Sequence, residues 1–181
     1  IIRQEVEALT RMIQQLFDLA KLDSNQFVIN RREVLLCDVI KQVGDRVTPA
    51  FDANNHTLQI NCHEEIKVFI DPDRFGQVMW NLLDNARKYL SDQGTVKVEV
   101  IESTEEVCIK VQDNGIGIEK DALEHLFTRF YRVEKSRSRK TGGTGLGLSI
   151  VKEIIDAHQG SVSIESELGK GTLVLIKLPK Y

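Results

Sequence analysis

Residues 139–150 read "RKTGGTGLGLSI", and the spacing of the glycines in this stretch narrows the folds that the chain can adopt. A P-loop needs the spacing GxxxxGK[ST], which no glycine here meets, and a dinucleotide fingerprint needs a third glycine where Leu148 stands. Glycines still let the backbone approach a ligand closely, and free N–H groups at a helix start attract phosphate. The stretch therefore predicts either a phosphate loop of another kind or a flexible hinge before a helix.

The composition is that of a soluble globular protein. Of 181 residues, 28% are charged and 41% are hydrophobic, and the net charge of −3 argues against a protein that binds nucleic acid with its whole surface. Cys37, Cys62 and Cys108 form no CxxC pair, so they are predicted to be separate, small buried residues in a reducing compartment. No apolar run is long enough to span a membrane, and no signal peptide is visible. Because the chain starts without Met inside a predicted helix, we expect a fragment of a longer protein.

The N-terminal segment 1–24 has the pattern of a helix that pairs with another helix. Its apolar residues alternate in steps of four and three: Ile2, Val6, Leu9, Ile13, Leu16 and Ala20. This heptad seam favours a bundle or dimer, although a helix lying on its own domain would show the same pattern. Turn-forming residues end the segment.

The rest of the chain interleaves strands and helices. Strand patterns cover about 32–36, 56–62, 67–70, 94–103, 105–113, 160–166 and 171–178. Helices are predicted from about 37 onward, over 72–90 with Asp71 as its N-cap, over 120–126 and over 146–158. Most strands are joined by hairpins. The pattern therefore predicts an α/β sandwich, a mixed sheet covered by helices on one face, and not a doubly wound sheet.

The predicted helix 72–90 carries a polar stripe beside its apolar face. At 100° per residue, the apolar face comprises Phe75, Val78, Met79, Leu82, Leu83 and Ala86. Asn81, Asn85 and Lys88 lie at its margin, where polar groups are unfavourable unless something binds them. An Asn oxygen is a plausible Mg²⁺ ligand when a nucleotide supplies phosphates, and Lys88 could meet a phosphate. The alternative is a solvated helix flank. Tyr89 is either a core aromatic or a ring that stacks on a base.

A second glycine motif, "DNGIGI", occupies residues 113–118. A tight turn would explain it. However, Asp113 ends a strand that should be largely buried, and its carboxylate needs a partner such as the exocyclic amine of adenine. Gly115 and Gly117 would let a flat base lie against the backbone.

Residues 126–141, "LFTRFYRVEKSRSRKT", interleave aromatic residues with a basic run. Within 128–141, six basic residues face one acidic residue, a local balance of +5. Read alone, the segment could be a nucleic-acid patch or a solvated loop. Its place between the two glycine motifs favours a mobile lid over a triphosphate.

Four segments, in this order, resemble the catalytic and ATP-binding domain of sensor histidine kinases of two-component systems. They are similar to the N box (81–89), the first glycine box (113–118), the F box (126–132) and the second glycine box (142–150) of that family. The wider superfamily includes DNA gyrase, the ninety-kilodalton heat-shock chaperones and MutL. The resemblance implies a mixed, mainly antiparallel five-stranded sheet under three helices over residues 28–181, with ATP between the helices and the lid.

The resemblance also implies roles for individual residues in binding ATP and Mg²⁺. Asn85 would coordinate magnesium, Asn81 and Lys88 would lie near the phosphates, and Arg132 would reach the γ-phosphate when the lid closes. In this view Asn85, Lys88 and Arg132 carry catalysis. The adenine would contact Tyr89, Asp113, Gly115, Gly117 and Ile118. Phe130, on the lid, would be a further nucleotide-binding residue. The phosphates would lie on the backbone of Thr144, Gly145, Leu146 and Gly147.

One departure concerns the phosphate acceptor. The family transfers the γ-phosphate to a histidine in a pattern like HExRTP on a dimeric helical hairpin, and none of His56, His63, His125 and His158 has that context. Residues 1–24 look like the second helix of the hairpin, so the acceptor helix would lie upstream. This implies a kinase fragment that binds Mg·ATP without phosphorylating itself. It would be the cytoplasmic part of a membrane-anchored, homodimeric sensor phosphoprotein that relays phosphate to a response regulator.

Two alternatives remain at this point. The chain could be an ATPase or serine kinase of the same superfamily, but gyrase-type members carry a glutamate base in the N-box helix, and Asp84 falls on the side away from the apolar face. It could also be a regulatory module that binds ATP and a partner helix without transferring phosphate.

Overall fold

The computed structural model describes residues 28–133 and 144–180. The helix predicted for residues 1–24 therefore lies outside the described residues. So do Gly142, Gly143 and most of the basic run of the predicted lid, at 134–141.

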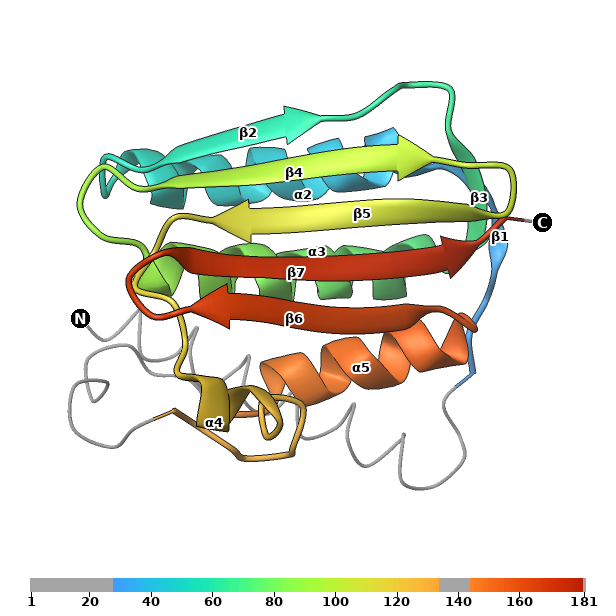
Figure 1. The fold of residues 1–181 in the computed structure, drawn as a ribbon. Coiled ribbons are helices and arrows are strands. Elements are labelled where there is room, and N and C mark those ends of the chain that lie inside the picture. The colour runs from blue at the N-terminus through green and yellow to red at the C-terminus, as the bar shows by residue number, and fades with distance from the viewer. Residues whose placement is uncertain (1–27, 134–143, 181) are drawn as a thin grey trace, which may run out of the picture.

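A five-stranded mixed sheet forms one layer of the protein, as predicted (Figure 1). Its spatial order is β2 (Thr57–Asn61), β4 (Thr95–Glu102), β5 (Glu106–Asp113), β7 (Gly171–Pro179) and β6 (Ser161–Glu167). Strands β2 and β4 run parallel, and the other three pairs are antiparallel. Each strand alternates, with Val96, Val98 and Val100 of β4 buried and Lys97 exposed between them. One face of the sheet therefore supplies the core, because side chains alternate between faces.

Three helices cover that face: α2 (Leu36–Asp52), α3 (Pro72–Tyr89) and α5 (Gly147–Ala157) (Figure 1). The apolar face predicted for α3 is confirmed, since every one of its members is buried: Phe75, Val78, Met79, Leu82, Leu83 and Ala86. Helix α4 (Lys120–Leu123) is shorter than the predicted 120–126. The two-layer α/β sandwich is thus confirmed.

The start of α3 is fixed by a cap that the sequence predicted. The Asp71 carboxylate accepts the backbone N–H groups of Asp73 (3.1 Å) and Arg74 (3.0 Å), and Pro72 follows at the first helical position. The backbone N–H of Asp71 donates to Nε2 of the buried His158 at 3.0 Å. His158 therefore joins the end of α5 to the start of α3, a structural role.

A small second sheet was not predicted. The strand β1 (Arg32–Leu35) pairs antiparallel with β3 (Lys67–Ile70), although the sequence had indicated each strand separately. The pairing places the start of α2 beside the segment that follows β2, because the Leu36 N–H donates to the Ile66 carbonyl at 2.9 Å.

The prediction of three separate cysteines is wrong for two of them. Cys37, in the first turn of α2, and Cys62, directly after β2, are joined in a disulfide. Twenty-five residues separate the two in sequence, so spacing could not reveal the pair; the fold brings their Cα atoms to 5.8 Å. Cys108 is free. Within the residues described, none of the helices is both long and apolar enough to span a membrane.

Candidate nucleotide-binding site

The polar stripe of α3 faces the first residue of α5. Asn81 is 9% exposed, and Asn85 is half-buried. A Cβ added to Gly147 would lie 3.6 Å from Oδ1 of Asn81 and 3.8 Å from Nδ2 of Asn85. The N-box helix and the second glycine motif, more than 50 residues apart in sequence, are therefore neighbours, and a Cβ at Gly147 would be in ordinary van der Waals contact with both amides.

One amide of this stripe is buried without a partner. The Nδ2 group of Asn81 is inaccessible to solvent and makes no hydrogen bond. A buried donor left unsatisfied is unfavourable by about 1–3 kcal/mol, which a ligand oxygen would relieve. The surroundings thus suit a phosphate ligand.

The residues also fit a magnesium ion that is held mainly by its nucleotide. No cluster of three or more His, Cys, Asp or Glu side chains in the described ranges could hold a metal ion by itself. Mg²⁺ commonly binds through one or two protein oxygens together with substrate phosphates and water. The half-buried side-chain amide of Asn85, which lies beside Gly147, carries one such oxygen.

Lys88 forms an ion pair with Asp84, a residue that the sequence placed away from the apolar face of the helix. Asp84 pairs with Lys88 at 2.6 Å and with Arg87 at 2.9 Å, and all three side chains are only 24–26% exposed. Burial alone would raise the pKa of Asp84, but the hydrogen bonds from Lys88 and Arg87 outweigh it and hold that pKa below its ordinary value. Asp84 is thus an ionised anchor and poorly suited to act as a general base.

Asp113 lies at the end of β5 with one carboxylate oxygen committed to the fold. Its Oδ1 accepts the backbone N–H groups of Gly115 (2.8 Å) and Thr172 (3.2 Å). No residue in the described part of the chain donates to Oδ2. Burial raises the pKa of Asp113 despite the two backbone hydrogen bonds. A donor such as an exocyclic amine would complete this half-buried carboxylate.

The glycines of the first glycine motif allow close backbone contacts. A Cβ on Gly115 would meet the carbonyl of Tyr89, which accepts the N–H of Ile116 at 3.0 Å. The motif is thereby packed on the end of α3. The side chain of Tyr89 is 44% exposed, which excludes the first of its two predicted roles, that of a core aromatic.

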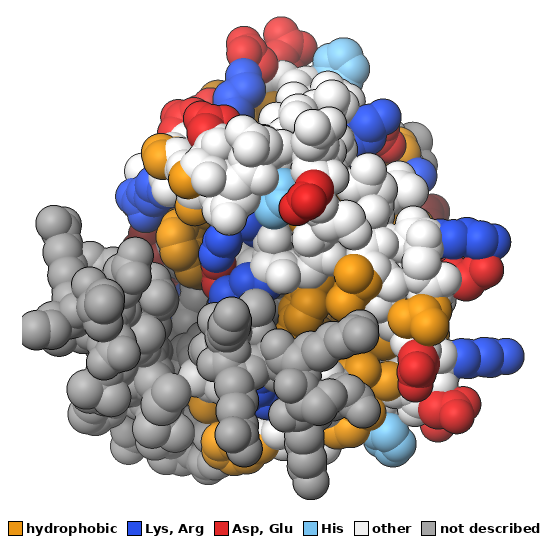
Figure 2. Space-filling model, turned by 90° about the vertical axis from the view of Figure 1, so that its left-hand side faces the viewer, with side chains coloured by type: hydrophobic (Ala, Val, Ile, Leu, Met, Phe, Trp, Pro, Cys, Tyr) orange, Lys and Arg blue, Asp and Glu red, His pale blue; other side chains and the backbone are white. Residues whose placement is uncertain are grey.

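The second half of the motif is packed on the β6–β7 hairpin. Gly117 has φ +68°, and a Cβ there would collide with the backbone carbonyl of Glu167. The Ile118 N–H donates to Oγ of Ser166 at 2.9 Å. Figure 2 views this end of the molecule, where hydrophobic side chains gather at the surface; Ile116 and Leu168 are 52% and 60% exposed.

The F box and the second glycine motif meet at the base of the predicted lid. The Phe130 N–H donates to the Gly145 carbonyl at 2.9 Å. Both residues adopt positive φ, +63° and +73°, and a Cβ on Gly145 would lie 2.8 Å from the Phe130 carbonyl carbon. The two ends of the segment between them are therefore tied together.

The remaining predicted residues occupy the same region. The Phe130 ring is 61% exposed, and Arg132 is exposed. Thr144 Oγ1 accepts the Leu146 N–H at 3.3 Å, and the Leu146 side chain belongs to the core. The contacts of Ser166 and Thr172 were not predicted, because they are set by the register of β6 and β7 and carry no motif. The pairing of Asp84 with Lys88 was also missed, although the two residues are four apart on one helix.

The fold and the site together define an ATP-binding α/β sandwich. A family model described as histidine kinase-, DNA gyrase B- and HSP90-like ATPase matches residues 70–181. The chain belongs to this family. It is 37% identical to the sensor histidine kinase WalK of Bacillus subtilis over an aligned length of 181, which covers 99% of this chain and 30% of WalK.

Solved structures of histidine kinases share the fold of this chain. The nucleotide-free catalytic domain of the histidine kinase ThkA superposes with a TM-score of 0.73 at 27% identity, covering 83% of this chain and 98% of that one. The histidine kinase AdeS of Acinetobacter baumannii gives a TM-score of 0.81 at 25% identity, covering 98% of this chain and 81% of AdeS. The chain is thus an ATP-binding catalytic domain of the sensor histidine kinase type.

Proposed function

We propose that this domain positions Mg·ATP so that its γ-phosphate is transferred to a histidine on a dimerisation helix outside the present chain. The single observation that carries the proposal is the meeting of Asn81, Asn85 and Gly147, with an unsatisfied buried amide between the N-box helix and the start of α5. Phosphoryl transfer depends mainly on positioning and charge neutralisation, which such a site can supply.

Each part of the site has a role in this proposal. Asp113 would accept a hydrogen bond from the adenine amine, with Tyr89, Gly115, Gly117 and Ile118 around the base. The amide of Asn85 would bind the magnesium ion, which would neutralise phosphate charge. Lys88 would approach the phosphates from its place beside Asp84.

The lid side of the site completes the proposal. Phe130 and Arg132 would close over the triphosphate about the Phe130–Gly145 hydrogen bond, with Arg132 reaching the γ-phosphate. The backbone of 144–147 would lie under the phosphates, since it leads into the N-terminus of α5, where the helix dipole favours negative charge.

The same proposal divides the chain into two parts. Residues 28–181 would form the catalytic domain, and residues 1–24 the second helix of the dimerisation hairpin, whose first helix would carry the acceptor histidine. The complete protein would be a homodimeric, membrane-anchored sensor that passes its phosphate to a response regulator. The present chain spans 30% of the length of WalK.

Mixing the chain with a separately produced dimerisation hairpin and γ-labelled ATP tests the transfer. We expect an acid-labile phosphate on the hairpin histidine and none on the chain alone. A hairpin whose histidine is replaced by glutamine is the control. Label on the chain alone would contradict the proposed division of labour, and steady ATP hydrolysis without label on the hairpin would favour an ATPase.

A further inference from the structure

A disulfide between Cys37 and Cys62 fastens the start of α2 to the end of the edge strand β2. The Cα atoms are 5.8 Å apart, within the usual range for disulfides. Cys108, the remaining cysteine, lies on β5 and is free. The bonded pair therefore comes from segments that only the fold brings together.

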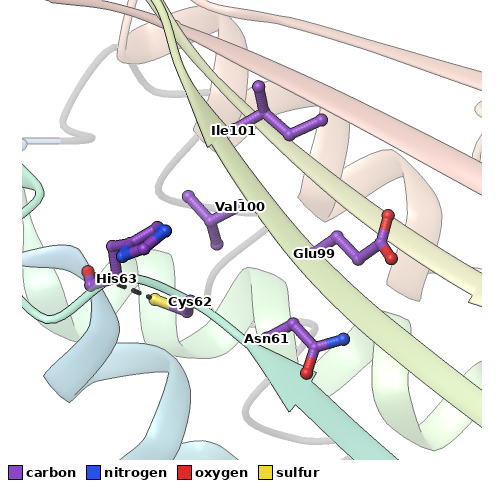
Figure 3. Close-up of a pocket in the computed structure, with 6 residues that line it drawn as sticks. All are labelled: Asn61, Cys62, His63, Glu99, Val100 and Ile101. Atoms are coloured by element: carbon purple, nitrogen blue, oxygen red, sulfur yellow. Dashed lines mark hydrogen bonds between the residues drawn. The ribbon is translucent and has the colours of Figure 1, made fainter.

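The two sulfurs differ in access. Cys37 is fully buried, whereas Cys62 is partly exposed and lines a surface pocket of about 320 Å³. The wall on the β2 side is Asn61, Cys62 and His63, and β4 supplies the facing wall with Glu99, Val100 and Ile101 (Figure 3). A small thiol entering this pocket would reach the sulfur of Cys62 and not that of Cys37.

The position of Cys37 makes it the better leaving group. It is the second residue of α2, a helix of 17 residues. The positive end of a helix dipole and the free N–H groups of the first turn stabilise a thiolate and speed its departure. Attack at Cys62 with departure of Cys37 is therefore favoured by access, and the helix N-terminus offsets the effect of burial on the Cys37 thiolate.

We propose that Cys62 is a site of reversible thiol–disulfide exchange with a low-molecular-weight thiol, and that Cys37 is the resolving cysteine. The thiolate of the small molecule attacks Cys62 Sγ, a new S–S bond forms, and the protein S–S bond breaks with its electron pair on Cys37, which takes up a proton. A second small thiol attacks the mixed disulfide and releases the small disulfide, leaving Cys62 as a thiol. The protein gains two electrons and two protons, and the small disulfide reverses the reaction.

The local consequence is a change in how the β2–β3 connection is held. After reduction, the bond from Leu36 N–H to Ile66 and the exposed ion pair of Lys41 with Glu64 still fasten it. We expect amide exchange in this connection to become at least tenfold faster. The site is independent of nucleotide binding, because Cys62 lies beside Val100 of β4 whereas Asp113 pairs opposite Val96.

Glutathione serves as the probe. Wild-type protein first treated with oxidised glutathione should show one thiol that titrates under native conditions, and three after denaturation in reductant. Brief exposure to reduced glutathione, followed by alkylation and peptide mapping, should place the mixed disulfide on the peptide with Cys62. More than one native thiol after the oxidising treatment, or a mixed disulfide mainly on the Cys37 peptide, would overturn the proposal.

Single-cysteine variants provide the matched comparison. In Cys37→Ser, oxidised glutathione should modify Cys62 faster than Cys108, because Cys62 lines the surface pocket and burial raises the pKa of the Cys108 thiol. In Cys62→Ser, Cys37 should stay unmodified in the folded protein. Equal rates at Cys62 and Cys108, or rapid modification of Cys37, would contradict the assignment. The wild-type mapping does not depend on how well either variant folds.

Discussion

Replacing Asp113 by asparagine tests the proposed adenine contact with little disturbance of the fold. In the structure Oδ1 accepts two backbone N–H groups, from Gly115 and Thr172, and an asparagine oxygen can accept both. The substitution replaces Oδ2 with an amide donor. That donor would face the donor amine of adenine, so one charged hydrogen bond is lost and none replaces it.

The magnitude follows from the strength of such a bond. A hydrogen bond to a charged group contributes about 1.5–3 kcal/mol, so we expect Asp113→Asn to weaken ATP binding about 10- to 150-fold. The free energy of unfolding should change by less than about 1 kcal/mol, because both backbone donors keep their acceptor. Burial raises the pKa of Asp113, so the fold gains nothing from this charge that the variant would forfeit.

Calorimetry with a non-hydrolysable ATP analogue and Mg²⁺ measures the effect. The control ligand is the purine riboside triphosphate, which has the same phosphates and lacks the exocyclic amine. Wild-type protein should prefer the adenine nucleotide by about the factor that the substitution removes, and the variant should show no preference. Unchanged affinity, or an equal loss for both nucleotides, would refute the assignment of Asp113.

Three further predictions concern the stability of the fold, each measured by urea unfolding. Gly117→Ala should be at least about 1 kcal/mol more destabilising than Gly169→Ala, because both have positive φ but only Gly117 faces a backbone carbonyl; equal effects would contradict this. Burial lowers the pKa of His158 from 6.5, so its contribution to stability should be present above pH 6.5 and lost as pH falls below it; a His158→Gln variant should lack this slope. Reducing the bond between Cys37 and Cys62, which closes 25 residues, should lower the free energy of unfolding by about 3.5 kcal/mol, whereas the double serine variant should not respond to reductant.

Much of the fold was predictable because local patterns and the core agree. The apolar face of α3, its Asp71 cap with Pro72, and the alternation in β4 and β5 each reflect forces that act within a few residues. The side-by-side position of Asn81 and Gly147 was expected only through the resemblance to a family, because no local rule links residues so far apart.

The remaining features depend on contacts between distant segments. The pairing of β1 with β3 and the bond between Cys37 and Cys62 arise where α2 starts beside the end of β2. The partnership of Asp84 with Lys88 was accessible in principle, since residues four apart on a helix are neighbours. The 100° spacing of residues around the helix placed Asp84 away from the apolar face, but this spacing alone did not identify the side chains that Asp84 contacts.

A crystal structure of the chain with Mg²⁺ and a non-hydrolysable ATP analogue tests the central claim most directly. The account predicts the adenine amine at Asp113, the metal at the side-chain oxygen of Asn85, and the phosphates between Asn81 and the start of α5. A nucleotide bound elsewhere, or with its base turned away from Asp113, would contradict it.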